Sequence, residues 1–199
     1  MESHLQSEMK PHLDLACVKI EEMSDKLNDT EVKLRGTQEK LETRIFIWKI
    51  GNFREILRKA IAKKIVSKES PPFYTDRTES YGYKLKVKMY PYGTGSGMDT
   101  HLSVFIVVMK GEYDSILPWP FKKKVKVTLI DQQEDPFERE NVTRSLNPAN
   151  HSKRLDRPTT EQNVGSGFSR FLSHEDLYSR RYIVDDTLFL QVEVCPLYN

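Results

Sequence analysis

The N-terminal part of the chain carries apolar residues at every seventh position, which is the spacing of a coiled-coil helix. Residues 8–44 contain no proline after Pro11, and Gly36 is the one strong helix-weakening residue among them. The pattern therefore predicts a single helix over residues 8–44. Its apolar stripe, the expected seam of the coiled coil, consists of Leu13, Ile20, Leu27, Leu34 and Leu41.

The narrow width of this stripe distinguishes between two arrangements of the helix, a coiled coil and a helix docked on its own domain. A helix docked on its own domain usually presents a broader apolar face, whereas a coiled coil presents a narrow seam. We therefore favour a coiled coil over a docked amphipathic helix, and the stripe does not set the number of strands. Because Thr30 and Thr37 occupy core positions of the heptads, we expect the coiled coil to be marginal without the adjoining domain or neighbouring sequence.

From about Ile45 onward the apolar period changes to two, which is typical of β-strands. Short alternating segments are separated by polar connections that contain proline and glycine. This organisation predicts a mainly β protein, an antiparallel sandwich over residues 45–196. We expect strands at residues 83–90, 101–109, 125–130 and 188–194, and short helices at residues 53–65 and 173–180.

Three glycines at alternate positions, Gly93, Gly95 and Gly97, lie between two predicted strands. Glycines that cradle a phosphate stand between a strand and a helix, where backbone N–H groups and the helix dipole face the anion. Here a strand-forming segment follows the loop, and neither a Gly-Lys-Ser/Thr nor a GxGxxG spacing is present. We therefore interpret the loop as a hairpin turn whose glycines supply positive φ, and not as a nucleotide site.

Closing this hairpin decides which side chains face outward, because a one-residue slip reverses every side chain. If the aliphatic faces of both strands pack inward, the first strand directs Lys88 and Tyr90 outward. The second strand then directs Ser103, Phe105 and Val107 outward. A cation, a phenol and a phenylalanine exposed together indicate a binding surface. The alternative is that another segment of the chain covers Phe105 and Val107.

The charge of the chain is nearly balanced, with Lys+Arg 31, Asp+Glu 29 and a net charge of +2. This balance argues against a nucleic-acid binder. No apolar run is long enough to span a membrane, and the start lacks the apolar middle of a secretory signal, so we expect a cytoplasmic location. Cys17 and Cys195 lie near opposite ends of the chain and predict neither a disulfide framework nor a zinc site.

Two clusters of basic residues offer a different kind of surface. The first contains Arg58, Lys59, Lys63 and Lys64, and the second is the run 122–124. Such clusters are commonly solvated, but they also attract anionic lipid head groups. A peripheral scaffold that binds anionic lipid is therefore an alternative function.

No arrangement of residues in the sequence predicts catalysis. The five histidines form no HExxH motif, and no GxSxG motif is present. Ser173 to Asp176 include the residue types of a catalytic triad, but consecutive residues on one helical turn cannot align for catalysis, and a capping box explains them. Asp185 and Asp186 would point to opposite sides of an extended chain. We expect no enzyme activity, no cofactor and no metal site in this chain.

Several longer motifs follow one another along the chain. They are FIWKIGNF (46–53), PPFYT (71–75), YGYKLKVKMY (81–90), THLSVFIVVMKGEYDSILPWPF (100–121), VTLIDQ (127–132), RPT (157–159) and YIVDDTLFLQVEV (182–194). In this order they resemble the C-terminal TRAF (MATH) domain of the tumour necrosis factor receptor-associated factors, and the heptad helix resembles the coiled coil of that family. The resemblance covers nearly the whole chain. GEYDSILPWPF and FLSHEDL look most like the branch of the fourth and sixth vertebrate members.

The resemblance implies an eight-stranded antiparallel β-sandwich on a parallel, three-stranded coiled coil. Such a homotrimer binds short peptides in the cytoplasmic tails of clustered receptors, or in adaptors attached to them, and the peptide lies as an added strand along one edge of the sandwich. Three weak sites on one trimer gain avidity when receptors cluster. The implied protein is a cytoplasmic signalling adaptor that is recruited to membrane receptors.

The resemblance also implies which positions contact the peptide. Lys88 stands where the family usually carries an arginine that pairs with an acidic peptide residue, and Tyr90 and Phe105 match aromatic contacts beside it. Residues 165–167 match a segment that offers backbone hydrogen bonds, and Phe168 matches an aromatic that packs on a peptide side chain. The full set of expected contacts is Lys88, Tyr90, Thr94, Phe105, Leu146, Pro148, Ser152, Gly165, Ser166, Gly167 and Phe168.

Four departures from the family pattern change the expected peptide. Lys88 keeps the charge of arginine but loses its bidentate fork, Thr94 replaces an acid and Leu146 replaces a phenylalanine. A run of three serines that some members use for polar peptide side chains appears here as Ser152-Lys153-Arg154. We therefore expect the protein to bind an acidic–aromatic motif rather than the motif read by three serines.

Full-length relatives of this kind carry a RING and zinc fingers, for which this chain has no ligands. We therefore expect the chain to be a fragment, with zinc and any ubiquitin-ligase function in domains outside it. A related domain without a trimeric stalk serves as a substrate receptor of ubiquitin ligases, which is a further alternative. The heptads of residues 8–44 disfavour that alternative.

Overall fold

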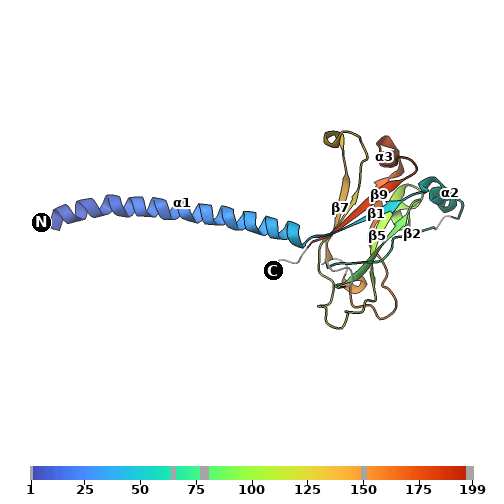
Figure 1. Cartoon of the computed structure of the whole chain (residues 1–199), viewed down its shortest axis with the longest axis horizontal. Helices are drawn as coiled ribbons and strands as arrows, with labels where there is room; N and C mark the ends of the chain where they lie inside the picture. Colours follow the sequence, from blue (N-terminus) through green and yellow to red (C-terminus); the bar gives the residue numbers. More distant parts are fainter. Residues whose placement is uncertain (1, 64–65, 77–80, 149–151, 196–199) are drawn as a thin grey trace. The chain divides into compact units, whose positions relative to one another are not determined.

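The computed structural model describes residues 2–63, 66–76, 81–148 and 152–195, and they fall into two units with the boundary between Glu42 and Thr43 (Figure 1). The first unit is the single helix α1 (Glu2–Glu42). The second unit contains the described strands, which form two sheets. The end of α1 therefore lies close to the point where the apolar period changes from seven to two.

Helix α1 confirms the predicted helix, although it begins at Glu2 and ends at Glu42 rather than covering residues 8–44, and its apolar seam is exposed in the single chain. The exposed fractions are 59–66% for Leu13, Ile20, Leu27 and Leu34. Leu41 lies among the residues whose side chains are not described. The hydroxyl of each seam threonine donates to the carbonyl oxygen four residues earlier, at 2.8 Å from Thr30 and 2.9 Å from Thr37. These bonds satisfy both hydroxyls within the helix. The coiled coil itself stays a prediction.

The second unit is an antiparallel β-sandwich, which confirms the predicted fold class. One sheet has the order β1 (Arg44–Ile50), β9 (Leu188–Val194), β6 (Val125–Leu129) and β7 (Val142–Leu146). The other has the order β2 (Lys68–Glu69), β4 (Lys84–Tyr90), β5 (His101–Met109) and β8 (Ser166–Ser173), and β3 (Phe73–Tyr74) also pairs with β4. The described residues contain nine strands rather than eight, because two short strands, β2 and β3, share the same side of β4.

Strands β4 and β5 supply much of the core from the second sheet. Leu85 pairs with Val108 and Val87 pairs with Ile106, and these four residues are at most 2% exposed. Burying each such side chain stabilises the fold by about 1.5–3 kcal/mol. The first sheet contributes buried aliphatic side chains from β6 and β9 to the same core. The predicted aliphatic inner face of residues 101–109 is therefore confirmed.

Strand β8 pairs with β5 and forms one edge of the second sheet. Phe105 pairs with Gly167 and Ile106 pairs with Ser166 at the start of β8. Further along, the register shifts between Leu102 and Val104, which marks a β-bulge or a similar irregularity. The start of β8 therefore lies beside the middle of β5, and its other long side is not paired with any described strand.

Two short helices complete the second unit, α2 (Phe53–Lys63) and α3 (His174–Ser179). The Ser173 hydroxyl caps α3 by accepting a hydrogen bond from the backbone N–H of Asp176 at 3.0 Å. The same hydroxyl contacts the Asp176 carboxylate at 2.6 Å. These contacts confirm the predicted cap by Ser173, whereas Asp176 binds the Ser173 hydroxyl instead of its backbone N–H.

The pair Asp185–Asp186 does not have the extended backbone that we expected. Both residues have positive φ, 48° and 57°, and this turn brings Asp186 to the N-terminus of α2. There its carboxylate accepts from the backbone N–H of Arg54 at 2.7 Å, and its carbonyl oxygen accepts from that of Phe53 at 3.1 Å. Asp186 thus satisfies helix donors that would otherwise lack partners.

The glycine loop connects β4 to β5, as predicted, and contains the 3-10 turn Gly95–Gly97. Gly93 and Gly95 have positive φ, 78° and 57°. Gly97 does not, and its role is different from the one predicted. A Cβ atom on Gly97 would lie 1.8 Å from the carbonyl oxygen of Ser169 in β8. Gly97 therefore allows the loop to approach the edge strand beside the outer face of the sheet.

Replacing Gly97 by alanine should destabilise the sandwich far more than the same change at Gly95. The added Cβ at position 97 would force the loop away from β8, at a cost of more than about 3 kcal/mol. Gly95→Ala is the matched control, because its Cβ would meet only the Ser169 hydroxyl at 3.5 Å. It should cost about 1–2 kcal/mol for the left-handed backbone alone. Urea unfolding followed by tryptophan fluorescence measures both variants, since Trp48 and Trp119 lie in the second unit. Equal losses would contradict the close approach.

Candidate functional site

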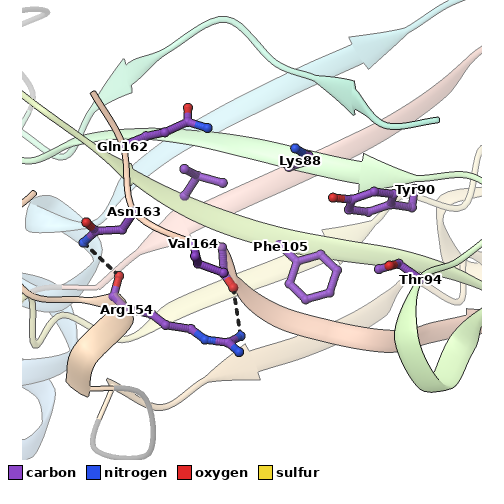
Figure 2. A pocket seen from close by; sticks show the side chains of 10 residues that line it. Lys88, Tyr90, Thr94, Phe105, Arg154, Gln162, Asn163 and Val164 are labelled. Atoms are coloured by element: carbon purple, nitrogen blue, oxygen red, sulfur yellow. Dashed lines mark hydrogen bonds between the residues drawn. The ribbon is translucent and has the colours of Figure 1, made fainter. Parts of the chain in front are cut away.

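A pocket of about 440 Å³ opens on the outer face of the second sheet, over strands β4 and β5 (Figure 2). The two strands and the loop between them line one part of it, and the segment before β8 lines another. Five of the expected contact residues line this pocket, namely Lys88, Tyr90, Thr94, Phe105 and Gly165. The remaining lining residues are Val107, Arg154, Gln162, Asn163 and Val164.

Strand register places a row of four residues across the second sheet. Glu69 of β2 pairs with Lys88 of β4, Lys88 pairs with Phe105 of β5, and Phe105 pairs with Gly167 of β8. Paired residues on neighbouring strands point to the same face. The row therefore runs from a carboxylate through an ammonium group to an aromatic ring. It ends at Gly167, which puts no side chain between Phe105 and the edge of the sheet.

The aromatic rings of Tyr90 and Phe105 meet edge to face in this pocket. Their centroids are 5.9 Å apart and their planes are inclined by 88°. The Lys88 ammonium lies 5.6 Å from the centroid of the Tyr90 ring, within the range of a cation–π contact. Figure 2 shows the three side chains beside one another. The structure therefore brings together the cation, phenol and phenylalanine that the hairpin pattern predicted, and their role in binding stays a prediction.

The Lys88 ammonium already has an anionic neighbour within the chain. It lies 3.2 Å from one carboxylate oxygen of Glu69, and the other oxygen of Glu69 lies 2.6 Å from the Lys86 ammonium. The hydrogen bond from Lys86 lowers the pKa of Glu69, and Lys88 adds to this effect against the cost of partial burial. Partial burial alone would lower the pKa of Lys88, but Glu69 and Tyr90 raise it overall. Both shifts favour the charged forms of Glu69 and Lys88, so these two groups form an ion pair near neutral pH.

The loop after β4 covers Ser103, the first of the three residues expected on the outer face of β5. Ser103 is fully buried. Its hydroxyl accepts a hydrogen bond from the backbone N–H of Thr94 at 3.0 Å and donates to the carbonyl oxygen of Ser169 at 2.5 Å. Ser103 thus fastens the glycine loop to β8, and Thr94 is positioned at the rim of the pocket by this bond.

The segment before β8 covers Val107 but leaves Phe105 partly open. Val107 is 1% exposed, whereas Phe105 is half-buried. The backbone N–H of Asn163 in this segment donates to the carbonyl oxygen of Val108 at 2.9 Å. The alternative that another segment covers Phe105 and Val107 is therefore correct for Val107 and wrong for Phe105.

Arg154 brings a second cation to the pocket. It belongs to the 3-10 turn Ser152–Arg154, and its Nη1 donates to the carbonyl oxygen of Gly165 at 3.1 Å. The Asn163 side-chain amide in turn donates to the carbonyl oxygen of Arg154, also at 3.1 Å. Figure 2 shows Arg154 and Lys88 on different sides of Phe105. An extended ligand over Phe105 would therefore lie between two positive charges.

Two expected contact residues face the core instead of the pocket. Leu146 is 2% exposed and pairs with Val125 in the first sheet, so it is not available to a peptide at this site. Phe168 pairs with Val104, whose side chain lies in the core, and the Phe168 ring packs against that core with its centroid 6.1 Å from Phe171. Successive residues of a strand point to opposite faces, so Phe168 lies on the face opposite to Gly167. The buried Leu146 is therefore not a contact of this pocket, and the contact expected of the half-buried Phe168 stays a prediction.

The other expected contacts are less direct. Ser166 is fully buried, and its hydroxyl has no partner among the described residues. Ser166 can therefore serve a peptide only through its backbone, as the resemblance implied. Pro148 is half-buried after β7 and does not line the pocket. Ser152 begins the turn that carries Arg154, and its side chain is not described.

Glu69, Arg154, Gln162 and Asn163 are site residues that sequence reasoning did not assign. The sequence could have indicated Arg154, because this arginine stands in place of a serine that some family members use to bind peptides. Glu69 lies in a two-residue strand, which is too short to show an apolar period. Gln162 and Asn163 lie in the segment before β8, outside any periodic pattern.

The described part of the chain shows no group of three or more His, Cys, Asp or Glu side chains placed to hold a metal ion. Within the same residues, no helix combines the length and apolar character needed to cross a membrane. Cys17 and Cys195 are both free thiols. The strongest candidate site is therefore the pocket beside β8, with its aromatic floor and two cations.

Residues 65–191 match the family model described as TRAF/meprin, MATH domain. Mouse TNF receptor-associated factor 1 is 41% identical over 167 residues, which are 83% of this chain and 39% of that relative. Human TNF receptor-associated factor 6 is 32% identical over 200 residues, which are 100% of this chain and 38% of that relative. The solved structure of Notothenia coriiceps TRAF5 aligns with a TM-score of 0.69 and 31% identity, and the alignment covers 97% of this chain and 96% of that one.

The mouse and human relatives are much longer than this chain, which spans less than two-fifths of their length. The identity to factor 1, 41%, exceeds the identity to factor 6, 32%. These two values give no support to the expected placement beside the fourth and sixth members. They do agree with the wider resemblance that the motifs carried.

A double-mutant cycle should show that Tyr90 and Phe105 stabilise each other. Edge-to-face aromatic pairs contribute about 0.5–1.5 kcal/mol beyond the area that they bury, so the two single alanine variants should together lose more than the double variant loses. Urea unfolding followed by tryptophan fluorescence gives the coupling free energy. Tyr90→Ala combined with Phe137→Ala is the control, because Phe137 is 98% exposed. A coupling no larger than in this control would contradict the aromatic contact.

Proposed function

Because the chain belongs to the TNF receptor-associated factor family, we propose that it is a trimeric signalling adaptor that binds short peptide motifs in the cytoplasmic tails of receptors or of their adaptors. The observation that carries this proposal is the position of the pocket. Its half-buried aromatic floor and two cations share one pocket with the segment that leads into β8, and no described strand pairs with the outer edge of β8. This combination supports a ligand that adds its backbone to the edge and places a side chain in the pocket.

The edge of β8 supports the backbone part of this binding. Alternate residues of an edge strand direct their N–H and C=O groups away from the sheet. A peptide paired with the start of β8 would lie beside Gly167, and no side chain at that position would separate it from Phe105. A Cβ on Gly167 would lie 2.3 Å from the carbonyl oxygen of Val104, so the sheet itself requires glycine there. The peptide side chain can therefore cross the edge strand at this point.

The side chains of the pocket support an acidic and aromatic ligand. An aromatic side chain can pack on Phe105 and Tyr90, and a carboxylate can bind Lys88. Arg154, on the β8 side of the pocket, favours a second anionic or strongly polar group. Lysine at position 88 offers a single charge rather than a bidentate fork, so the geometry it imposes on the carboxylate is less strict than an arginine would impose.

The exposed seam of α1 supports the trimeric part of the proposal. Large aliphatic residues at seam positions are more than half exposed in the single chain, and association would bury them. Three peptide sites on one trimer gain avidity by a factor of about 10² to 10⁴ when clustered receptors present several tails. The proposal includes a cytoplasmic location with recruitment to membrane receptors, and it assigns no catalytic activity to this chain.

The lipid-binding alternative has weaker support. Within the first basic cluster, Arg58 and Lys59 pair with Glu55 at 2.8 Å and 3.4 Å, which reduces the charge available to a lipid head group. Lys63 belongs to the residues whose side chains are not described, and Lys64 lies outside the described residues. The substrate-receptor alternative also has weaker support, because it does not use a long apolar seam.

Replacing Lys88 by methionine should weaken the binding of acidic peptides and leave the binding of their neutral counterparts unchanged. The probe is a library of ten-residue peptides rich in Ser, Thr and Pro that carry one Glu and one Phe or Tyr at every spacing. Each peptide has a twin with Gln in place of Glu. A charged hydrogen bond contributes about 1.5–3 kcal/mol, so affinity for the best Glu peptides should fall at least about tenfold by fluorescence anisotropy. Lys122→Met, an equal change at an exposed site away from the pocket, should have no effect. Unchanged binding in Lys88→Met would place the site elsewhere.

Light scattering of the intact chain should give a mass near three times the 23.3 kDa of one chain. The variant Ile20→Asp/Leu27→Asp puts charges into the seam and should be monomeric. Its affinity for a single peptide should match that of the unchanged protein. Its affinity for the same peptide fused to a trimeric carrier should be weaker by about two orders of magnitude, because avidity is lost. A monomeric unchanged protein, or equal binding to the carrier, would contradict the trimeric adaptor.

A further inference from the structure

Glu69 is an acidic residue within a site that we propose to select acidic peptides. It stands directly opposite Lys88 in the β2–β4 ladder, so both side chains lie on the outer face of the sheet. One of its carboxylate oxygens lies 3.2 Å from Lys88, the other 2.6 Å from Lys86. The Glu69 carboxylate therefore already pairs with Lys88, the lysine that a peptide carboxylate would bind.

The two lysines that share Glu69 differ in how much they depend on it. The Lys86 side chain is 10% exposed and makes the shorter contact, so it needs a partner inside the protein. The Lys88 side chain is 27% exposed and also lies against the Tyr90 ring. Lys88 can therefore turn toward an incoming carboxylate while Glu69 stays with Lys86. Glu69 would remain close to that carboxylate, and the two negative charges would repel each other.

We propose that Glu69 is a specificity-determining residue that acts as a built-in competitor for Lys88 and lowers the affinity of the pocket for acidic peptides. This inference rests on the proposed peptide-binding function and adds a residue to it. Lys88 alone would favour a carboxylate strongly over an uncharged amide. With Glu69 beside it, part of that preference is cancelled, because the peptide carboxylate both replaces an existing contact and meets a like charge. Single acidic peptides therefore bind weakly, and binding depends on several sites engaging together.

The competitor model makes opposite predictions for removing the charge of Glu69 and for removing the charge of Lys86, its second partner. In Glu69→Gln, Lys88 loses its internal carboxylate and becomes fully available to the peptide. In Lys86→Met, Glu69 keeps Lys88 as its only cation and should hold it more firmly. The first change should strengthen the binding of acidic peptides and the second should weaken it. A merely structural role of Glu69 would weaken binding in both variants, or in neither.

The test measures anisotropy of the Glu and Gln twin peptides with the intact chain. Glu69→Gln should raise affinity for the Glu peptides about fivefold, as expected for loss of one partly exposed ion pair, and should change affinity for the Gln twins by less than about twofold. Lys86→Met should lower affinity for the Glu peptides only. If Glu69→Gln is unstable because Lys86 has lost its partner, Glu69→Gln/Lys86→Met removes both charges and should show the same gain. Tryptophan fluorescence during urea unfolding checks that each variant is folded.

Two outcomes separate this inference from the proposed function. In the first outcome, Lys88→Met weakens binding of the Glu peptides, but neither folded variant with Gln at position 69 binds them more tightly. Glu69 is then not a competitor, and the proposed peptide site is still supported. An equal gain for Glu peptides and Gln twins would also overturn the inference, because the effect would then not be electrostatic. If Lys88→Met leaves every peptide unchanged, the peptide site itself is wrong, and the inference fails with it.

Discussion

The antiparallel register between β4 and β5 is the constraint on which the site depends. Lys88 pairs with Phe105 and Tyr90 pairs with Ser103, while the residues between them pack into the core. Slipping β4 by one residue would reverse its faces, burying its lysines and exposing its aliphatic side chains, and the same slip of β5 would turn Phe105 into the core. The core therefore holds the site in place: the packing that stabilises the sandwich also decides which side chains form the pocket.

The second sheet changes in character from one edge to the other. On the β2 side, Glu69, Lys86 and Lys88 form a charged group whose members largely satisfy one another. The middle is aromatic, and the β8 side has glycine and a strand edge with which no described strand pairs. A ligand that enters from β8 first meets hydrogen-bonding groups, then an apolar surface, and finally a cation that is already paired. In the proposed binding mode, backbone and aromatic contacts would supply most of the affinity, and the charged group would adjust selectivity.

Sequence reasoning predicted the parts of this arrangement that follow from periodicity. The strand at residues 101–109 has the expected bounds, and the register brings Lys88, Tyr90 and Phe105 together because both strands bury an aliphatic face. Periodicity does not reveal Glu69, since a two-residue strand has no period. The resemblance was a weaker guide to peptide contacts at Leu146 and Phe168, which do not line the pocket. There, strand alternation turns the side chains into the core.

An unpaired strand edge is usually a hazard, because it can join the same edge of another molecule and start an aggregate. Only the beginning of β8 is suited to regular pairing. Further along, the register shift opposite Leu102 and Val104 disturbs the strand, and the exposed Arg170 adds a charge. A regular stretch this short accommodates a few residues of a guest chain but cannot propagate into a continuous sheet. Under the proposed recruitment to clustered receptors, this short edge would let the protein be crowded with β8 open and still remain dispersed.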